Sequence, residues 1–541
     1  MSQDDWNARF EQGSARFATE ADAIRMKMYR QTATSCFLGL RGGRPLYGDH
    51  PGAMLIVAPS RAGKGSELVT PNLMTGVQSG RTQVVLNTKG DLYHITKNQA
   101  ADDKAVYCWN LDGRPDVPED RVNPFEGMRW QSRTLESDTK TVCLGLIPDS
   151  ASGKDKYFTT GGRAIMEALC YAVAKRDGVV TLPALYGATN AVRTGGAAWK
   201  RLAEDLADTE NPLCQRVRAE LDLYHADPHG GGMKDIIGEL GNAMSFASDP
   251  NAMRAVTPPF SVSIKNDLCS AERFANFYII CEAEKLETHA PIIKALLNML
   301  FLTKARLPGA LGQDWILDET ALLGSYPMVE TLASYGPGFG IRPWFVFQNF
   351  KQADALGPRA RQTIFANAQT QMFFGTRDLE TCRMLSDMVG RETLEVDDPL
   401  TQSRGRHERD AMKRAILMGA DPFEVGLAFQ QKSYEATHRR KVGRSLMTPD
   451  EIRIQLQTKM LLFADGLPGP LLVDRMPYWK RRSLAGKYLP DPYHPPMDSV
   501  LVQTRWGQRR RAVITEEVDP RFAHLPQYAD GQWSYVEGYK P

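Results

Sequence analysis

The chain has 541 residues and a formal net charge of only +2, from 66 Lys and Arg against 64 Asp and Glu. Hydrophobic residues make up 42% of the sequence and charged residues 24%, which is the composition of an ordinary soluble globular protein. The length predicts two or three domains, and the near-neutral charge excludes a protein that binds nucleic acid through an overall basic surface. Any such surface must therefore be local.

The eight cysteines are scattered with no C-x-x-C pair, which argues against a zinc ribbon or a disulfide framework and favours reduced thiols. No run approaches the roughly 18 consecutive apolar residues of a membrane-spanning helix. Acidic and basic residues are spread through the N-terminal stretch, which is unlike a signal peptide. We therefore expect a cytoplasmic chain without an intrinsic transmembrane segment, which only partners could hold at a membrane.

Residues 1–36 are polar, carry apolar residues at roughly helical spacing, and are predicted to form an N-terminal helical segment. Glycines and prolines then lead to the apolar run 54–57, which predicts a short buried strand. After this strand the turn-forming residues 58–62 precede a helix that we expect to end before Pro71.

The junction between this strand and this helix is a candidate phosphate-binding loop. A strand, a small-residue turn and a helix start place free backbone N–H groups at the positive end of a helix, and Lys64 can reach the outer phosphates. The residues expected to bind the nucleotide are Ser60, Arg61, Ala62, Gly63, Lys64, Gly65 and Ser66.

The loop departs from the pattern G-x-x-x-x-G-K-[ST] at two positions. Ala58 stands where the pattern has glycine, and Gly65 stands where it has the hydroxyl that usually helps to hold Mg²⁺. Ser66 follows one residue late. Two alternatives stay open for it, a magnesium contact through a water molecule or a helix cap.

The segments after the loop alternate between strand and helix patterns. Strands are predicted at 82–86, 105–109, 277–281, 315–317, 343–347 and 370–374, where the sequence is rich in apolar and β-branched residues. This alternation favours an α/β fold with a mainly parallel sheet. From about 139 to 260 helical patterns dominate, as in 161–175 and 204–224, which predicts an all-helical domain inserted into the α/β core.

Two later strands end in residues suited to phosphate chemistry. Asp318 and Glu319 follow the run 315–317, where Asp318 would orient magnesium through its waters and Glu319 would polarise the attacking water. Gln348 follows the run 343–347 and can hydrogen-bond the γ-phosphate or the water. Lys89 and Asp91 lie just beyond another strand end, where open sheets bind ligands.

These motifs, taken together, resemble the TraG/TraD-type coupling ATPases of type IV secretion and conjugation. The resemblance covers roughly residues 37–480 and rests on the loop, VVLNTKGDL, WILDETALLG, FGIRPWFVFQNFKQ and the run 364–394, which is its most particular part. It implies a RecA-like P-loop ATPase core, formed by residues 37–138 and 261–480, with the all-helical insert at 139–260.

The resemblance also implies roles for individual residues. ATP and Mg²⁺ would be the cofactors, Lys64 the phosphate-binding lysine, Asp318 and Glu319 the paired acidic residues, and Gln348 the glutamine after the next strand. Some relatives carry a trans-acting arginine near the turn 336–338, where this chain offers Pro337, and Arg342 is the candidate here.

The function implied is that of a homo-hexameric ATPase. It would pass a relaxase bound to single-stranded DNA, or a protein effector, to type IV secretion channel components at the inner membrane. We expect no counterpart in this sequence of the N-terminal membrane helices typical of the family. Two alternatives stay open: a cytosolic double-stranded-DNA translocase of the same superfamily, and a docking adaptor that binds ATP but hardly hydrolyses it, suggested by Ala58, Gly65, Asn87 and Pro337.

Four local basic clusters complete the candidates, at 404–414, 438–444, 479–482 and 505–511. Arginine beside tryptophan, as in the last two, suits single-stranded nucleic acid, although most charge runs are solvated faces. Residues 481–541 are rich in proline and are expected to form an irregular C-terminal tail that packs on the body or binds a partner.

Overall fold

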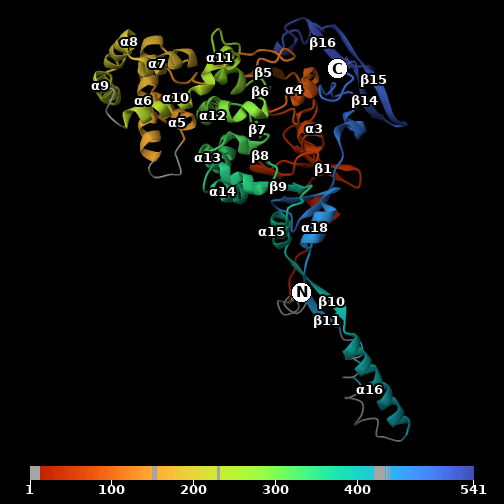
Figure 1. Cartoon of the computed structure of the whole chain (residues 1–541). Coiled ribbons are helices and arrows are strands. Elements are labelled where there is room, and N and C mark those ends of the chain that lie inside the picture. Colours follow the sequence, from red (N-terminus) through yellow and green to blue (C-terminus); the bar gives the residue numbers. More distant parts are fainter. Residues whose placement is uncertain are drawn as a thin grey trace. The chain divides into compact units, whose positions relative to one another are not determined.

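The computed structural model describes residues 12–148, 155–227, 232–418, 430, 433, 437 and 439–541 (Figure 1). The chain divides into two compact units. The larger comprises Lys27–Gly375, Thr458–Asp465 and Val473–Pro541, and the smaller comprises Met1–Met26, Thr376–Gln457 and Gly466–Leu472. This division differs from the predicted one, because the segment after residue 375 does not stay with the core that precedes it.

The larger unit is built around one mainly parallel sheet. Its eleven strands among the described residues lie in the spatial order β2 (Arg44–Gly48), β1 (Cys36–Arg41), β13 (Leu471–Asp474), β12 (Lys459–Ala464), β9 (Ala368–Phe374), β3 (Ala53–Val57), β8 (Ile341–Phe347), β7 (Gln313–Leu317), β4 (Thr82–Asn87), β6 (Ala275–Ile280) and β5 (Ala105–Asn110). The seven from β9 to β5 pair in parallel, while β12 pairs with β9, and β1 with both β2 and β13, in the antiparallel sense.

The central strands are buried over their whole length, which explains why apolar residues predominate in their sequences without a regular alternation of polar ones. Every residue of β3 through β8 in the parallel part is buried. A parallel strand covered on both faces has no solvent side and needs no alternation of polar residues. Six of the seven predicted runs, the first at 54–57, correspond to these strands and the seventh, 370–374, corresponds to β9, and the α/β fold class is confirmed.

Helices connect these strands. They are α3 (Thr70–Leu73), α4 (Asp91–Thr96), α12 (Ala283–Arg306), α13 (Met328–Tyr335) and α14 (Ala360–Asn367). The helix predicted to end before Pro71 instead continues to Leu73. Its first part, Gly65–Val69, is π-helical, and Pro71 lies in the first turn of α3, where a missing N–H is tolerated.

A block of helices follows β5 and gathers at one side of the larger unit (Figure 1). It consists of α5 (Leu135–Leu146), α6 (Asp155–Asp177), α7 (Leu182–Thr194), α8 (Gly196–Asp208), α9 (Pro212–Ala226), α10 (Met233–Ala243) and α11 (Pro250–Ala255). The helical pattern at 204–224 belongs to two helices, because Asn211 caps a new helix at Pro212 by accepting a hydrogen bond from Leu213 N.

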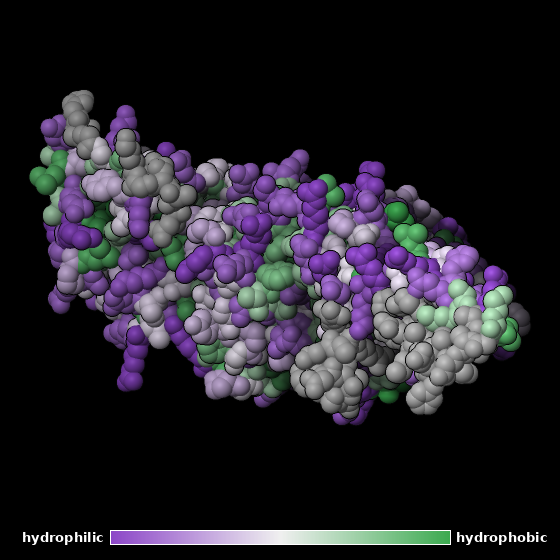
Figure 2. All heavy atoms as spheres, turned by 90° about the horizontal axis from the view of Figure 1, so that it is seen from below, coloured by the Kyte–Doolittle hydropathy of each residue, from purple (hydrophilic) through white to green (hydrophobic). Residues whose placement is uncertain are grey.

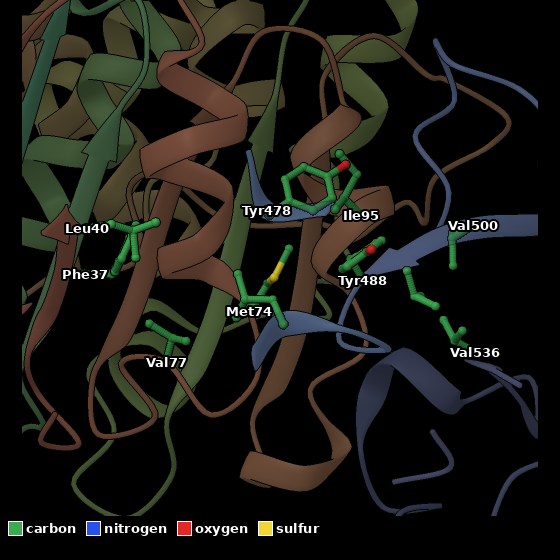
Figure 3. Packing of buried hydrophobic residues seen from close by; sticks show 11 residues of the cluster. Phe37, Leu40, Met74, Val77, Ile95, Tyr478, Tyr488, Val500 and Val536 are labelled. Atoms are coloured by element: carbon green, nitrogen blue, oxygen red, sulfur yellow. The ribbon is translucent and has the colours of Figure 1, made fainter. Parts of the chain in front are cut away.

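Residues 481–541 are not the irregular tail that the sequence predicted. They contain an antiparallel sheet of β14 (Ser499–Thr504), β15 (Gly507–Glu517) and β16 (Gln532–Val536). Val500, Val502 and Val536 from this sheet join a hydrophobic cluster with Met74 and Tyr478 (Figure 3). This packing fixes the C-terminal segment to the core of the larger unit.

The smaller unit holds α2 (Glu20–Arg25), α15 (Leu379–Val389), β10 (Arg391–Asp397), α16 (Pro399–Leu417), β11 (Arg439–Ser445) and α18 (Pro449–Gln455). Strands β10 and β11 pair antiparallel over their full length. Within the predicted helical segment 1–36, α2 spans only six residues and β1 begins at Cys36, while residues 1–11 lie outside the described part.

Hydrophilic residues predominate on the face shown in Figure 2, and apolar residues there form only small patches. Among the residues that the structure describes, no helix is both long enough and apolar enough to cross a membrane.

Candidate nucleotide-binding site

Three adjacent strands, in the order β3, β8 and β7, bring the candidate residues together. Strand β3 leads into the loop that carries Lys64, β8 leads into Gln348, and β7 leads into Asp318 and Glu319. Because these strands are parallel, their carboxyl ends lie at one edge of the sheet, which is where open α/β sheets bind ligands.

Glu319 is the centre of the polar contacts at this edge. Lys64 Nζ donates a hydrogen bond to Glu319 Oε1 at 2.5 Å, and Gln348 Nε2 donates to Glu319 Oε2 at 3.0 Å. Lys64 Nζ also lies 3.3 Å from Asp318 Oδ1. Burial opposes the charge on Lys64, but the two carboxylates outweigh it and raise the pKa of the ammonium. Lys64, Asp318, Glu319 and Gln348 therefore lie together, and we refer to these four residues as the charged cluster.

The backbone of Glu319 is strained. Its φ is +57°, in the left-handed region that side chains other than glycine rarely adopt. The Thr320 hydroxyl holds the turn in place, since it donates to Leu317 O at 2.6 Å and accepts from Val346 N at 3.1 Å. The turn after β7 is thus tied to β8, and this fixes the direction of the Glu319 carboxylate.

The phosphate loop also uses the left-handed region. Arg61 has a φ of +61° and Gly63 a φ of +96°. A Cβ atom on Gly63 would lie 2.8 Å from the carboxyl carbon of Glu67, closer than real Cβ contacts allow. Because this carbon belongs to the flexible end of the Glu67 side chain, the preference for glycine at position 63 comes from its backbone conformation. Glu67 N then donates to Gly63 O at 2.9 Å, at the start of the helix that follows.

Asp318 and Ser66 fit a magnesium ion. Asp318 Oδ1 is buried with Lys64 Nζ at 3.3 Å as its charged neighbour, and burial raises the pKa of this carboxyl against the effect of Lys64. Ser66 Oγ donates weakly to Gly63 O, at 3.4 Å. No cluster of three or more His, Cys, Asp or Glu exists within the described ranges. A magnesium ion needs only one or two protein oxygens as ligands when nucleotide phosphates and water molecules supply the others.

Arg342 does not lie with this cluster. It is the second residue of β8, at the end opposite Gln348, and only 1% of its surface is exposed. Its Nε and Nη2 donate to the two oxygens of Asp314 at 2.9 and 2.7 Å, and Nη2 also donates to Thr34 O at 2.9 Å. The structure therefore gives Arg342 a buried ion pair within the sheet.

Arg475, which directly follows β13, was not predicted from the sequence but contacts the phosphate loop. Its Nη1 donates to Ala62 O at 2.9 Å, and its Nε lies 3.3 Å from Glu67 Oε2. Its guanidinium also lies over the ring of Phe374, 4.8 Å from the centroid. Nothing in the sequence singled out Arg475, because it lies far along the chain and outside any motif.

A cavity of about 640 Å³ opens beside the charged cluster, a size typical of small-molecule sites. Lys64, Asp318 and Glu319 line it. Of the seven predicted nucleotide-binding residues, Ser60 and Ala62 are not among its lining residues and the other five are. The cavity also reaches Lys89 and Asp91 after β4, and residues from 478 to 510.

Asp91 is the second carboxylate of unusual character at this cavity. Burial, reinforced by the charges of Asp491 and Asp318 and opposed by Lys89, raises its pKa to about 6. The turn that carries Lys89 and Asp91 is shaped by Asn87, whose Oδ1 accepts from Lys89 N at 3.3 Å and Gly90 N at 2.9 Å.

The strand order and the four-residue cluster define a RecA-like P-loop fold. The chain matches the model of the family described as Type IV secretory system Conjugative DNA transfer over residues 5–507. It belongs to this family, and the resemblance predicted for residues 37–480 is confirmed and extended by this match.

Two curated relatives illustrate the similarity. The Escherichia coli conjugal transfer protein TraG is 22% identical over 456 residues, 78% of this chain and 65% of that protein. Protein VirD4 of Agrobacterium fabrum is 25% identical over 453 residues, 81% of this chain and 60% of that protein. The chain thus spans somewhat less than two thirds of the length of these relatives.

Solved structures of the bacterial conjugative coupling protein TrwB share the fold. One, of a form named TrwBdeltaN70 in complex with sulphate, gives a TM-score of 0.56 at 16% identity and covers 86% of this chain and 96% of that chain. Another, of TrwB in complex with ADP and Mg²⁺, gives a TM-score of 0.57 at 16% identity and covers 85% and 93%.

Proposed function

We propose that this protein is an ATP-hydrolysing coupling protein that delivers relaxase-bound single-stranded DNA, or a protein effector, to a type IV secretion channel. The observation that carries the proposal is the convergence of Lys64, Asp318, Glu319 and Gln348 at one sheet edge, in a chain of the conjugative DNA transfer family. The TrwB complex with ADP and Mg²⁺ supports ATP and magnesium as cofactors.

In this proposal the loop N–H groups and Lys64 bind the phosphates and stabilise the charge that develops on them. Asp318 and Ser66 would hold Mg²⁺, which when bound neutralises phosphate charge. Glu319 orients the attacking water and draws on its proton, and Gln348 fixes Glu319 through the bond at 3.0 Å. The roles are thereby divided among the segments that follow three neighbouring strands, β3, β7 and β8.

The contact between Lys64 and Glu319 adds a coupling step to this scheme. A γ-phosphate competes with Glu319 for the same ammonium, because Lys64 Nζ and Glu319 Oε1 are hydrogen-bonded. When Lys64 turns to the phosphate, Glu319 keeps Gln348 on one oxygen and gains a free acceptor on the other. Nucleotide binding itself then prepares Glu319 to accept a hydrogen bond from water.

The assembly and location are part of the same proposal. The chain would act as a homo-hexamer, receive a relaxase–single-stranded DNA complex, and be held peripherally at the inner membrane by channel components. The family described for conjugative DNA transfer supports this role. Arg342 is not retained as a trans-acting group, because its donors serve Asp314 and main-chain oxygens.

The test is steady-state ATP hydrolysis by the full chain, wild type beside Glu319→Gln, with and without single-stranded DNA. Loss of a general base costs on the order of 10²- to 10⁴-fold in rate, while ATP binding should persist. Glu284→Gln, at an exposed position of α12, is the matched control and should keep full activity. Full hydrolysis by Glu319→Gln would overturn the mechanism.

The same assay separates the alternatives. Stronger stimulation by double-stranded than by single-stranded DNA would favour the double-stranded-DNA translocase. Tight ATP binding by the wild type without turnover under any condition would favour the docking adaptor.

A further inference from the structure

Part of the cavity lining comes from the C-terminal segment. The aromatic and aliphatic side chains of this part include Tyr478, Trp479, Tyr488, Leu489 and Leu501. The same segment also contributes the polar or charged residues Asp491, His494, Ser499 and Arg510. One continuous cavity therefore joins a site suited to phosphates with an apolar, aromatic wall.

This wall is rigidly built. The ring of Tyr478 packs edge to face on Trp479 and on Tyr488, with centroid distances of 4.9 and 4.8 Å. Leu489 N donates to Ile95 O of α4 at 3.0 Å, and the Tyr488 hydroxyl donates to Leu501 O of β14. Figure 3 shows Tyr478 beside Ile95, with Tyr488 nearer to Val500 of the C-terminal sheet. The wall belongs to the same unit as the phosphate loop.

Trp479 is the aromatic residue of the wall that a ligand can reach most easily. Tyr478 and Tyr488 are 6% and 3% exposed, whereas Trp479 is only partly buried and sits at the edge of their cluster. An indole offers a broad apolar face, and base–aromatic stacking contributes on the order of 1–3 kcal/mol per base with little preference among bases.

We propose that residues 478–501 form the base-binding wall of the nucleotide site, with Trp479 as the main contact to the base. The inference rests on the proposed function, since it assumes that a nucleoside triphosphate binds with its phosphates at Lys64. The ligand class is a nucleoside triphosphate held by its base as well as its phosphates. Because stacking reads the ring rather than its substituents, ATP and GTP bind with similar affinity.

The test compares the binding of ATP, GTP and inorganic tripolyphosphate to the full chain by calorimetry. Trp479→Ala should raise the Kd of ATP and of GTP by about 5- to 100-fold, the range for loss of one base–aromatic contact. The Kd of tripolyphosphate should stay the same, and Trp479→Phe should recover most of the nucleotide affinity. The control is Trp506→Ala, which removes a tryptophan that is 79% exposed and does not line the cavity.

A second variant guards against a folding defect in Trp479→Ala. Leu501→Glu places a carboxylate at a cavity-lining position that is already 40% exposed. It should raise the Kd of ATP as much as Trp479→Ala does, and it should leave the Kd of tripolyphosphate unchanged. Unchanged ATP affinity in both variants, or equal losses for ATP and tripolyphosphate, would overturn the base-binding wall. A wild type that binds neither ligand would instead overturn the proposed function.

Discussion

Arg475 Nη1 donates a hydrogen bond to the main-chain oxygen of Ala62 at 2.9 Å. A residue after the last strand of the large sheet thus restrains the phosphate loop directly. The same guanidinium lies 3.3 Å from the Glu67 carboxylate. Burial raises the pKa of Glu67, and the charge of Arg475 opposes this shift without cancelling it. The loop and the start of its helix are therefore held by one cation from the far end of the chain.

Arg475→Ala should weaken nucleotide binding through the phosphates. The substitution frees the loop and leaves the Glu67 carboxylate without its cation, so the Kd of both ATP and tripolyphosphate should rise, by roughly tenfold for the loss of one charge-assisted contact. Arg482→Ala, at an exposed position nearby in sequence, is the control. A selective loss of ATP affinity with normal tripolyphosphate binding would contradict this role.

Gly375→Ala should disturb the phosphate loop through a steric clash with Ala62. Gly375 has a φ of +67°, and a Cβ there would lie 2.6 Å from Ala62 Cβ. Gly178 offers a matched control, because its φ is +81° and its Cβ would meet nothing within 4 Å. Both alanine variants should lose about 1 kcal/mol of stability from backbone strain. Only Gly375→Ala should also raise the Kd of ATP, measured beside the melting temperature.

The pair of Arg342 and Asp314 predicts a large effect on stability. Removing one partner of a buried ion pair costs about 3–5 kcal/mol, because the other charge is left uncompensated. Arg342→Gln should therefore lower the free energy of unfolding by this order in denaturant titrations. Arg359→Gln breaks an ion pair with Glu330 in which the arginine is 79% exposed, and should cost less than about 1 kcal/mol. A stable Arg342→Gln protein with a selective loss of turnover, restored by mixing with other subunits, would contradict the structural role.

The raised pKa of Asp91 predicts a specific pH dependence. The folded state binds a proton on Asp91 up to about pH 6, whereas the unfolded carboxyl releases it near its ordinary value of 3.8. Between these values the native state holds more protons, so this group makes stability fall as pH rises, and the loss is complete above pH 6. The melting temperature of Asp91→Asn, relative to that of the wild type, should therefore rise as the pH is raised from 4 to 7. The exposed control Asp208→Asn should show no such trend.

Much of the large sheet could be predicted from the sequence because its strands are buried on both faces. The runs that became β3, β4, β7 and β8 are rich in apolar residues, so their sequence pattern agrees with the observed strands. The C-terminal sheet escaped prediction for the opposite reason. Strand β15 has no fully buried residue, and its first half has the sequence of a basic cluster.

The candidate site was predictable where its residues follow strands directly. Asp318, Glu319 and Gln348 directly follow their strands, Lys64 follows β3 after a short loop, and the ends of parallel strands meet. Arg475 and the wall at 478–501 were not predictable, because only the folded chain brings them to the loop. For the same reason the sequence could not show that Arg342 faces Asp314 at the opposite strand end.

The contact between Arg475 and Ala62 joins residues 413 positions apart in the chain. At a synthesis rate of roughly 5–20 residues per second, the ribosome needs about 20–80 s to pass from one to the other. During that interval the nascent phosphate loop exists without its cation and without the base-binding wall. A chain cut short before residue 475 would carry every predicted motif of the nucleotide site and still lack the parts that hold it closed.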